Sequence, residues 1–258
     1  MLAQQRHEMI LTLLKKDGNV HTADLVNRMG VSSETVRKDL DYLEKCGQLN
    51  RVHGGAVPIP EQEAAPPLGY IALQTRNTQH IEQKTAIAEY ALTMVQEQQV
   101  IALDYGSTSQ MMALALKKQF QHLTIVTNSI QNALILSDCP GYTIILTGGI
   151  LNKNEYTLVD NMTPLMEHLH IDIYFMSVSG IDPVIGCTDL GFSEANIQNW
   201  MRHTAAKTIV LADSSKFGRA SLVKVCPISE VSCIITDSEL SADMKKAFSQ
   251  HAVNLVVV

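Results

Sequence analysis

The sequence predicts an α/β protein with a small N-terminal helical domain and a larger domain built on a mostly parallel, doubly wound sheet. Three short amphipathic segments separated by glycines occupy the first 57 residues. From Gln79 onward, short apolar runs alternate with helix-like text, which is typical of a sheet covered by helices. A length of 258 residues suits one small domain and one of ordinary size.

The composition excludes several classes of protein. Hydrophobic residues make up 46% of the chain, which predicts a real core and not a disordered chain. The five cysteines are odd in number and form no C-x-x-C pair, so we expect reduced thiols, a cytoplasmic protein and no structural zinc. His168 and His170 have no partners spaced as metal ligands, and we expect no metal. The sequence has no signal-peptide pattern and no apolar run long enough to span a membrane.

Charge is distributed unevenly along the chain. Residues 1–57 hold eight Lys and Arg against seven Asp and Glu, a balance of +1. The whole chain carries −6, which leaves −7 for the remainder. Any contact with nucleic acid is therefore expected in the first segment.

The first segment predicts three helices. The first covers residues 4–16 and ends at Asp17-Gly18; the second begins at Thr22 as its N-cap and ends at Gly30. The third is capped by Ser32. Its apolar residues recur at i, i+4 and i+7 and face the other helices, namely Val36, Leu40 and Leu43.

The third helix presents polar groups suited to DNA. Its N-terminal N–H groups, hydroxyls and two cations fit phosphates and the edges of guanine in a major groove. After it, "QLNRVHGGAV" predicts a hairpin, or wing, with a tight turn at Gly54-Gly55. The expected DNA-binding residues are Ser32, Ser33, Thr35, Arg37, Lys38, Arg51 and His53. The alternative from spacing alone is a three-helix domain with ordinary solvated charges.

These residues also resemble a known family. An R-x3-I opening, a VS-x2-T-[IV]-R-[RK]-DL-x2-L core and an R-x-HGGA ending stand in order in residues 6–56. They are similar to the winged helix-turn-helix domain of the DeoR family of bacterial transcription regulators. The resemblance implies that the third helix contacts the operator and that Arg51 and His53 belong to the wing.

A proline-rich stretch separates the two domains. Four of the eight prolines lie at positions 58, 60, 66 and 67. Because proline disfavours helix, we expect a semi-rigid linker there. The predicted domains are residues 1–57 and 79–258, with a linker over residues 58–78.

The larger domain contains seven apolar runs that predict strands. Helix-like text separates most of them, which indicates parallel pairing with both faces of the sheet buried. The runs cover residues 100–104, 123–127, 142–147, 172–180, 207–213, 231–236 and 253–258.

Polar residues follow most of these strands, and ligands of such sheets bind beyond the carboxyl ends of the strands. Glycine and hydroxyl groups at a helix start can hold phosphate, aspartates can accept hydrogen bonds from sugar hydroxyls, and Lys216 can neutralise a phosphate. The candidates from this pattern are Asp104, Gly106, Ser107, Thr108, Asn128, Ser129, Gly148, Gly149, Asp182, Asp213 and Lys216. The alternative is that these residues only cap helices and turns. No dinucleotide or Walker motif is present, and we expect no cofactor.

The resemblance extends through this half. "LDYGST", "LTIVTNS", "ILTGG", "SGID…GCT…E" and "LADSSKFG" match, in order, the sensor domain of the DeoR family. That domain is similar in fold to ribose-5-phosphate isomerase, and the resemblance implies a phosphorylated sugar as effector. Glu194 joins the candidate residues through this match.

Three positions depart from the patterns that the resemblance brings. "GCTDLGFSEANIQ" lacks the lysine and glycine run of the isomerases. Asp160 stands where the family usually has glycine, and its carboxylate could narrow the pocket or repel phosphate. Gln198 stands where the family often has lysine.

Three functions follow from these features. The favoured one is a DNA-binding repressor of a carbohydrate operon that binds a phosphorylated sugar or polyol and acts as a homodimer or homotetramer on double-stranded operator DNA. The second is a sugar-phosphate isomerase fused to a DNA-binding module, with Glu194 or Asp182 as acid or base. The incomplete isomerase motif argues against it. The third is a redox or nucleotide sensor, which the missing dinucleotide motif disfavours.

Overall fold

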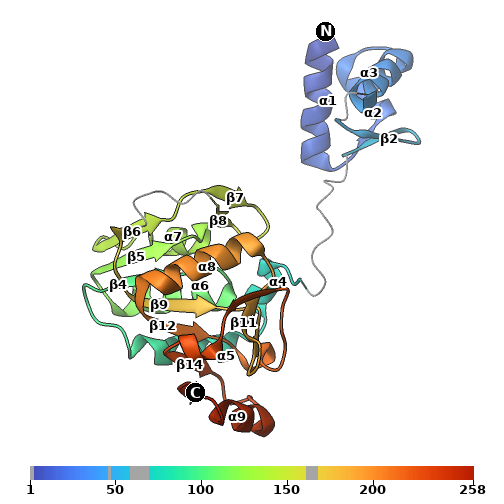
Figure 1. The fold of residues 1–258 in the computed structure, drawn as a ribbon. Helices are drawn as coiled ribbons and strands as arrows, with labels where there is room; N and C mark the ends of the chain where they lie inside the picture. The colour runs from blue at the N-terminus through green and yellow to red at the C-terminus, as the bar shows by residue number, and fades with distance from the viewer. Residues whose placement is uncertain (1–2, 46–47, 59–69, 161–167) are drawn as a thin grey trace. The chain divides into compact units, whose positions relative to one another are not determined.

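The computed structural model describes residues 3–45, 48–58, 70–160 and 168–258. The chain forms two compact units, Met1–Pro66 and Pro67–Val258 (Figure 1). Pro60, Pro66 and Pro67 of the expected linker lie outside the described residues. The expected linker reached residue 78, whereas Leu73–Thr78 form helix α4 of the second unit, with Leu73 buried.

The first unit is the expected winged helix-turn-helix. Its elements are α1 (Ala3–Asp17), β1 (Val20–His21), α2 (Thr22–Met29), α3 (Ser33–Lys45), β2 (Asn50–Val52) and β3 (Gly55–Val57).

The helices of this unit pack through the predicted apolar face of α3. Val36, Leu40 and Leu43 are buried in one cluster with residues of α1 and α2. Ser32 caps α3, because its Oγ accepts a hydrogen bond from the Thr35 N–H at 3.2 Å. The cap predicted for α2 is wrong: His21 is the N-cap residue, and the N–H of Thr22 donates to the Gly54 carbonyl instead.

The three strands form an antiparallel sheet in the order β1-β3-β2. The Gly54-Gly55 pair is required at its turn. Gly54 has a φ of 87°, and a Cβ on Gly55 would collide with the Val20 carbonyl of β1. The wing is therefore tied to the helices through β1.

A buried ion pair holds α1 against α3. The Asp39 carboxylate accepts hydrogen bonds from Arg6 Nε at 2.6 Å and Arg6 Nη2 at 3.0 Å, and His7 Nε2 lies 3.0 Å from it. Burial opposes ionisation of Asp39, but the bonds from Arg6 and His7 outweigh it and hold the pKa of this carboxyl below its usual value. Arg6 and Asp39 both belong to the family motif, and their role here is structural.

The second unit is the expected doubly wound domain. Its main sheet contains β4 (Val100–Leu103), β5 (Leu123–Thr127), β6 (Tyr142–Leu146), β9 (Ile171–Ser177), β12 (Ala205–Leu211), β14 (Cys233–Thr236) and β15 (Leu255–Val257). All neighbours pair in parallel, in the order β15-β14-β12-β9-β4-β5-β6.

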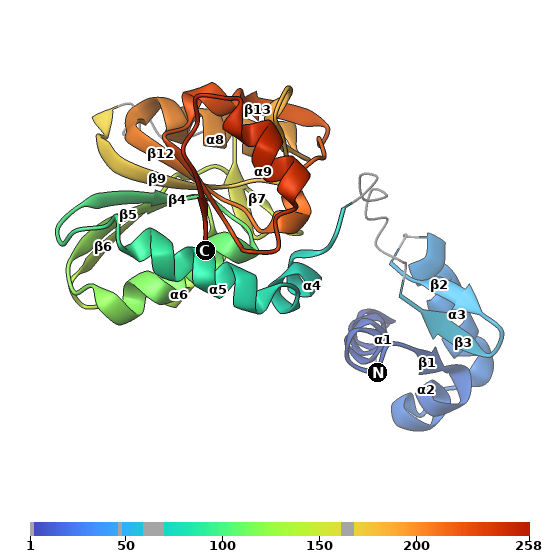
Figure 2. The same ribbon diagram turned by 90° about the horizontal axis from the view of Figure 1, so that it is seen from below.

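Helices cover both faces of this sheet (Figure 2). Side chains alternate along each strand, so Ile101 and Leu103 pack toward α5 (Ile81–Leu92), α6 (Ser107–Gln119) and α7 (Ile130–Leu136). Ala102 and Tyr174 pack on the other face, toward α8 (Phe192–Thr204) and α9 (Ala242–Ser249). The continuous apolar strands in the sequence reflect this double burial.

Two small antiparallel sheets were not predicted. One is the hairpin of β7 (Ile150–Asn152) and β8 (Thr157–Val159); the other joins β10 (Gly180–Asp182), β11 (Gly186–Asp189) and β13 (Val223–Cys226). Short 3-10 helices follow β12 at η2 (Ser214–Lys216) and β13 at η3 (Ile228–Glu230). Strands of three or four residues carry too little alternation to be recognised from sequence.

Within the described residues, no helix is long and apolar enough to cross a membrane. The same residues contain no group of three or more His, Cys, Asp or Glu side chains that could hold a metal ion.

The ion pair in the first unit gives a stability prediction. We expect Asp39→Asn to lower the melting temperature of this unit by roughly 5 °C, because the substitution removes the charge that pairs with the half-buried Arg6 and weakens the hydrogen bonds between them. Since the pKa of Asp39 is depressed on folding, its stabilisation is present above the usual carboxyl range and is lost as the pH falls through the folded value. Scanning calorimetry should therefore show that the melting temperatures of the wild type and of Asp39→Asn approach each other at acidic pH. Asp17→Asn, at an exposed carboxylate of α1, is the control, and equal melting of all three at pH 7 would contradict the account.

Candidate functional site

The N-terminal end of α3 forms an exposed polar surface in the first unit. Ser32 and Ser33 are exposed there, and Thr35 is half-buried, with its Oγ1 2.9 Å from Ser32 Oγ. Arg37 and Lys38 are exposed on the side of α3 away from the buried apolar residues. Five of the seven predicted DNA contacts therefore gather on one helix end.

The wing residues differ from each other. His53 is exposed at the turn between β2 and β3. The guanidinium of Arg51 forms an ion pair with Asp41 of α3, and its backbone N–H donates to Glu44 Oε1 at 2.8 Å. Arg51 thus fixes the wing against α3, and its charge is already paired in the absence of DNA.

The second unit has a topological switch point between β4 and β9. From β4 the chain proceeds outward through β5 and β6, and from β9 it proceeds the other way through β12, β14 and β15. Loops that leave the carboxyl ends of β4 and β9 diverge, and ligands of open α/β sheets bind in the crevice between them.

A recess lies at this switch point. Its lining residues come from the loop after β4, the start of α6, the end of β9 and the loop after it, the end of β11, α4 and η2. They are Arg76, Tyr105, Gly106, Ser107, Thr108, Ser177, Val178, Ser179, Asp189 and Lys216.

One side of the recess is suited to an anion. Gly106 precedes α6 with a φ of 108°, a conformation that favours glycine, and the first N–H groups of α6 have no carbonyl acceptor inside the helix. Ser107 and Thr108 add hydroxyls, and Arg76 and Lys216 add positive charge. Burial lowers the pKa of Lys216. An anion bound beside Lys216 would favour the protonated side chain and raise this pKa again. Together these groups match a phosphate.

The other side of the recess is suited to hydroxyl groups. Ser177 Oγ is buried without a hydrogen-bond partner among the described residues. Asp189 accepts hydrogen bonds from Ser179 Oγ at 2.7 Å and from Gln198 Nε2 at 2.8 Å. An acceptor, a donor and a phosphate-binding end in one recess are what a phosphorylated polyol requires.

Asp104 lies behind the recess and not in its lining. It is fully buried and accepts hydrogen bonds from Tyr174 Oη at 2.9 Å and from the N–H of Ser177 at 2.8 Å. Gln198 Nε2 donates to it at 3.2 Å. Burial raises the pKa of Asp104 well above its usual value, and the nearby Asp189 adds to the shift. This carboxyl group positions the strand ends and is not available to a ligand.

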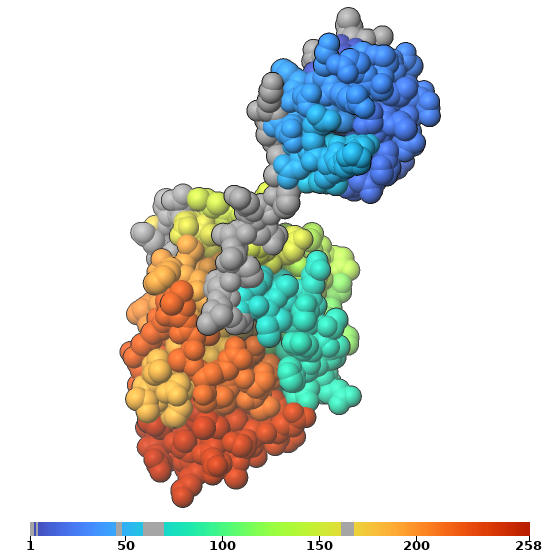
Figure 3. Space-filling model, turned by 90° about the vertical axis from the view of Figure 1, so that its right-hand side faces the viewer, coloured from blue at the N-terminus to red at the C-terminus, as the bar shows by residue number. Residues whose placement is uncertain are grey.

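Lys84 positions α4, which carries Arg76. Its Nζ donates to the Arg76 carbonyl at 2.6 Å and to the Gln79 carbonyl at the end of α4. Burial lowers the pKa of Lys84 to about 8. In Figure 3, the cyan atoms of α4 and α5 lie beside orange atoms from the last third of the chain, and Gln83 Nε2 of α5 donates to Glu239 Oε1, after β14 (Cys233–Thr236), at 2.7 Å. Arg76 and Lys216 thus reach one recess from segments far apart in sequence.

Four predicted effector contacts follow β5 and β6 and lie outside the recess lining. Ser129 caps α7 by accepting from the Asn132 N–H, and Asn128 is buried beside it. Gly148 and Gly149 have positive φ, and a Cβ on Gly149 would collide with the carbonyls of Val159 and Asp160. These glycines permit the close approach of β7 to β8.

Asp160 itself has a φ of 55°, which explains a preference for glycine at this position. Its carboxylate accepts from Ser193 Oγ at 3.1 Å and does not line the recess. The concern that it narrows the pocket therefore does not apply to the recess described here.

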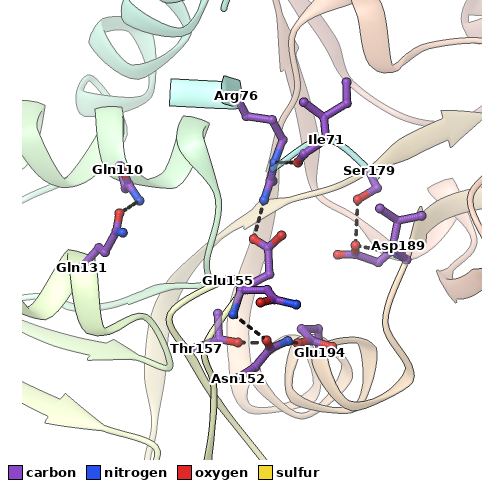
Figure 4. A network of polar contacts seen from close by, with 12 residues as sticks. Ile71, Arg76, Gln110, Gln131, Asn152, Glu155, Thr157, Ser179, Asp189 and Glu194 are labelled. Atoms are coloured by element: carbon purple, nitrogen blue, oxygen red, sulfur yellow. Dashed lines mark hydrogen bonds and ion pairs between the residues drawn. The ribbon is translucent and has the colours of Figure 1, made fainter. Parts of the chain in front are cut away.

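Three predicted carboxylates have other partners. Asp182 Oδ1 accepts from the N–H groups of Val184 and Ile185 and shapes the turn before β11. Glu194 Oε1 accepts from Asn152 Nδ2 at 2.7 Å and anchors the β7–β8 hairpin to α8 (Figure 4). Asp213 caps η2 through the N–H of Ser215. Neither Asp182 nor Glu194 is placed to act as an acid or base in the recess.

Sequence reasoning missed six of the residues that line the recess. They are Arg76, Tyr105, Ser177, Val178, Ser179 and Asp189. Arg76 fell inside the expected linker, and the sole sequence signal for it was its position just before the helical text at 81–96. Ser177 and Ser179 lay inside a strand predicted to run to residue 180, whereas β9 ends at Ser177.

Comparison with protein families matches both units. A DeoR-like helix-turn-helix domain matches residues 6–62, and the DeoR C terminal sensor domain matches residues 79–238. The second match alone covers more than half of the chain.

Curated relatives match along almost the whole chain. The HTH-type transcriptional regulator GolR of Listeria innocua is 33% identical over 96% of both chains. The L-fucose operon activator of Haemophilus influenzae is 31% identical over 98% of this chain and 99% of its own. The glycerol-3-phosphate regulon repressor of Escherichia coli is 28% identical over 99% of both.

Among solved structures, a D-ribose-5-phosphate isomerase in complex with phospho-erythronic acid is similar over 53% of both chains, with 19% identity and a TM-score of 0.41. This similarity is too low to bear on the ligand. The family matches and the full-length relatives do bear on identity: the chain belongs to the DeoR family of helix-turn-helix transcription regulators.

Proposed function

We propose that this regulator represses an operon of carbohydrate metabolism and releases its operator when a phosphorylated sugar or polyol binds the recess at the β4–β9 switch point. The observation that carries the proposal is the composition of the recess. Two cations and the N-terminus of a 13-residue helix face one side, and serine hydroxyls with Asp189 face the other.

The proposed binding mode follows from these groups. The phosphate occupies the N-terminus of α6, where Ser107, Thr108, Arg76 and Lys216 provide donors and charge. The hydroxyl groups of the ligand meet Ser177 and Asp189. A neutral sugar would make no use of the positive charge of Arg76 and Lys216, and a bare phosphate would leave the hydroxyl side empty, so we expect both parts to contribute.

The names of the relatives support the ligand class and leave the sign of regulation to experiment. One relative is a glycerol-3-phosphate regulon repressor, and another is an L-fucose operon activator. Repression is the proposal here, because release of operator by a ligand is the simplest outcome of a shape change that disturbs the placement of two recognition helices.

A thermal-shift screen of phosphorylated sugars and polyols tests the ligand class. A ligand that binds only the folded protein raises its stability by RT ln(1 + [L]/Kd), about 2.7 kcal/mol at 100 times Kd. We expect a phosphorylated compound to stabilise the protein and its dephosphorylated form to have no effect. If no phosphorylated compound does so, the proposed ligand class is wrong.

For DNA, we propose that α3 enters the major groove and that His53 approaches the phosphates. The exposed end of α3, with Ser33, Arg37 and Lys38, is the supporting observation. Arg51 contributes by holding the wing in place through Asp41.

Arg37→Ala is expected to weaken operator binding by roughly 1–3 kcal/mol if the side chain contacts a base, and by less if it contacts only phosphate. Gel-shift titrations on selected operator DNA and on random DNA distinguish the two cases. Lys118→Ala, an exposed cation of α6 in the sensor unit, is the matched control. Unchanged binding of the Arg37 variant to both DNAs would remove this residue from the interface.

Lys216→Ala, or Ser107→Ala combined with Thr108→Ala, is expected to leave operator affinity unchanged and to abolish release by the effector. These variants remove anion-binding groups from the recess and leave the first unit intact. Gel shifts with increasing effector measure the response, with Lys246→Ala on α9 as the control. Release at the wild-type effector concentration would place the effector site elsewhere.

We expect at least a homodimer, and a homotetramer is also compatible with the proposal. One winged helix with few free cations binds weakly, whereas two linked half-sites multiply the affinity. Light scattering of the protein with and without operator is the measurement. A monomer at micromolar concentration that still occupies a full operator would rule this out.

A further inference from the structure

Arg76 lies at the junction between the recess and the start of the sensor unit. Its Nε donates to the Ile71 carbonyl at 2.9 Å, and its Nη2 forms an ion pair with Glu155 (Figure 4). The same guanidinium lines the recess. A single side chain therefore contacts the proposed ligand site, the hairpin and the first described residues after position 69.

Glu155 is a buried partner in this contact. It lies on the turn between β7 and β8, and only 7% of it is exposed. Burial raises the pKa of its carboxyl, while Arg76 and a hydrogen bond from Tyr70 oppose that rise. Through Arg76 and Tyr70, Glu155 thus holds residues 70–71 against the hairpin.

The hairpin is held independently on its other side. Asn152 Nδ2 donates to Glu194 Oε1 of α8, and Thr157 Oγ1 lies 3.5 Å from the same oxygen. Asp160 accepts from Ser193 of α8. Loss of the Arg76–Glu155 pair would therefore leave the hairpin in place and weaken its hold on residues 70–71, where the hydrogen bond from Tyr70 to Glu155 remains.

An anion in the recess would compete with Glu155 for Arg76. Nη1 of Arg76 lies 3.7 Å from the point where a Gly106 side chain would begin, directly beside the N-terminus of α6. A phosphate bound there would attract the guanidinium and repel the nearby carboxylate. In a site of low solvent exposure this competition is strong, because neither anion is well screened.

We propose that the Arg76–Glu155 pair is a ligand-sensitive latch, which holds residues 70–71 to the β7–β8 hairpin in the empty protein and opens when a phosphate-bearing ligand draws Arg76 toward α6. This regulation rests on the proposed effector site. Residues 70–71 follow the stretch 59–69 that connects the two units in sequence. Opening the latch would therefore weaken the contact between residues 70–71 and the rest of the sensor unit.

The test uses the full-length protein and inorganic phosphate as the probe. Glu155→Gln removes the competing charge and keeps the shape of the side chain. We expect it to bind phosphate several-fold more tightly than the wild type by calorimetry. Asp138→Asn is the matched control, because it also removes one negative charge from an ion pair. Asp138 lies before the amino end of β6, pairs with Lys117 of α6 and does not line the recess.

Hydrogen–deuterium exchange then measures whether the latch is open or closed. In the wild type and in Asp138→Asn, phosphate should increase exchange in residues 70–76. In Glu155→Gln, exchange there should be high without phosphate and should change little when phosphate is added. If Glu155→Gln does not fold, Glu155→Asp, whose shorter side chain weakens the reach to Arg76, should shift both measurements in the same direction.

The outcomes separate the latch from the site. If phosphate binds in a manner that depends on Lys216, but Glu155 substitution changes neither affinity nor exchange, the latch is wrong and the effector site stands. If phosphate does not bind the wild type at millimolar concentration, the anion site is wrong and the latch falls with it.

Discussion

The buried carboxyl group of Asp104 joins the two strand ends on which the recess depends. It follows β4 directly, and it accepts hydrogen bonds from the N–H of Ser177 at the end of β9 and from the hydroxyl of Tyr174. The backbone of β4 and β9 diverges at this point, and a polar group without partners there would cost several kcal/mol. By satisfying these donors, Asp104 fixes the distance between the loop that begins α6 and the serines after β9. Both sides of the recess inherit their geometry from this contact.

Gln198 completes the same network. Its Nε2 donates to Asp104, to the Ser177 carbonyl and to Asp189. A lysine at this position would place a cation between the two carboxyl groups. The neutral amide of Gln198 places no cation there. The absence of a positive charge from Gln198 agrees with the raised pKa of Asp104. The side of the recess that holds Ser177 and Asp189 is therefore shaped by a neutral bridge.

Sequence reasoning predicted the fold and four of the residues that line the recess, because both leave local signals. Apolar runs of five to nine residues identified the seven strands of the main sheet, and Gly106-Ser107-Thr108 at a helix start pointed to three residues of the recess lining. Sequence reasoning failed for side chains whose position depends on contacts with distant parts of the chain. Arg76 enters the recess because Lys84 holds the end of α4, and Asp189 enters because β11 pairs with β13. Asp182 and Glu194 carried the expected chemistry, but local turn and hairpin contacts occupy them. A pattern of polar residues after strands predicts which residues lie at the same edge of the sheet. It does not predict which of their side chains remain available to a ligand.

The central claim is that the recess and the DNA-binding surface are linked. Reciprocal linkage tests it most directly. Once a phosphorylated ligand is identified, calorimetry should measure its affinity for the free protein and for the protein saturated with operator DNA. The account predicts that DNA weakens ligand binding by the same factor by which the ligand weakens operator binding. Ligand affinity that is identical with and without operator would contradict it, because a ligand that does not distinguish the two states cannot shift the balance between them.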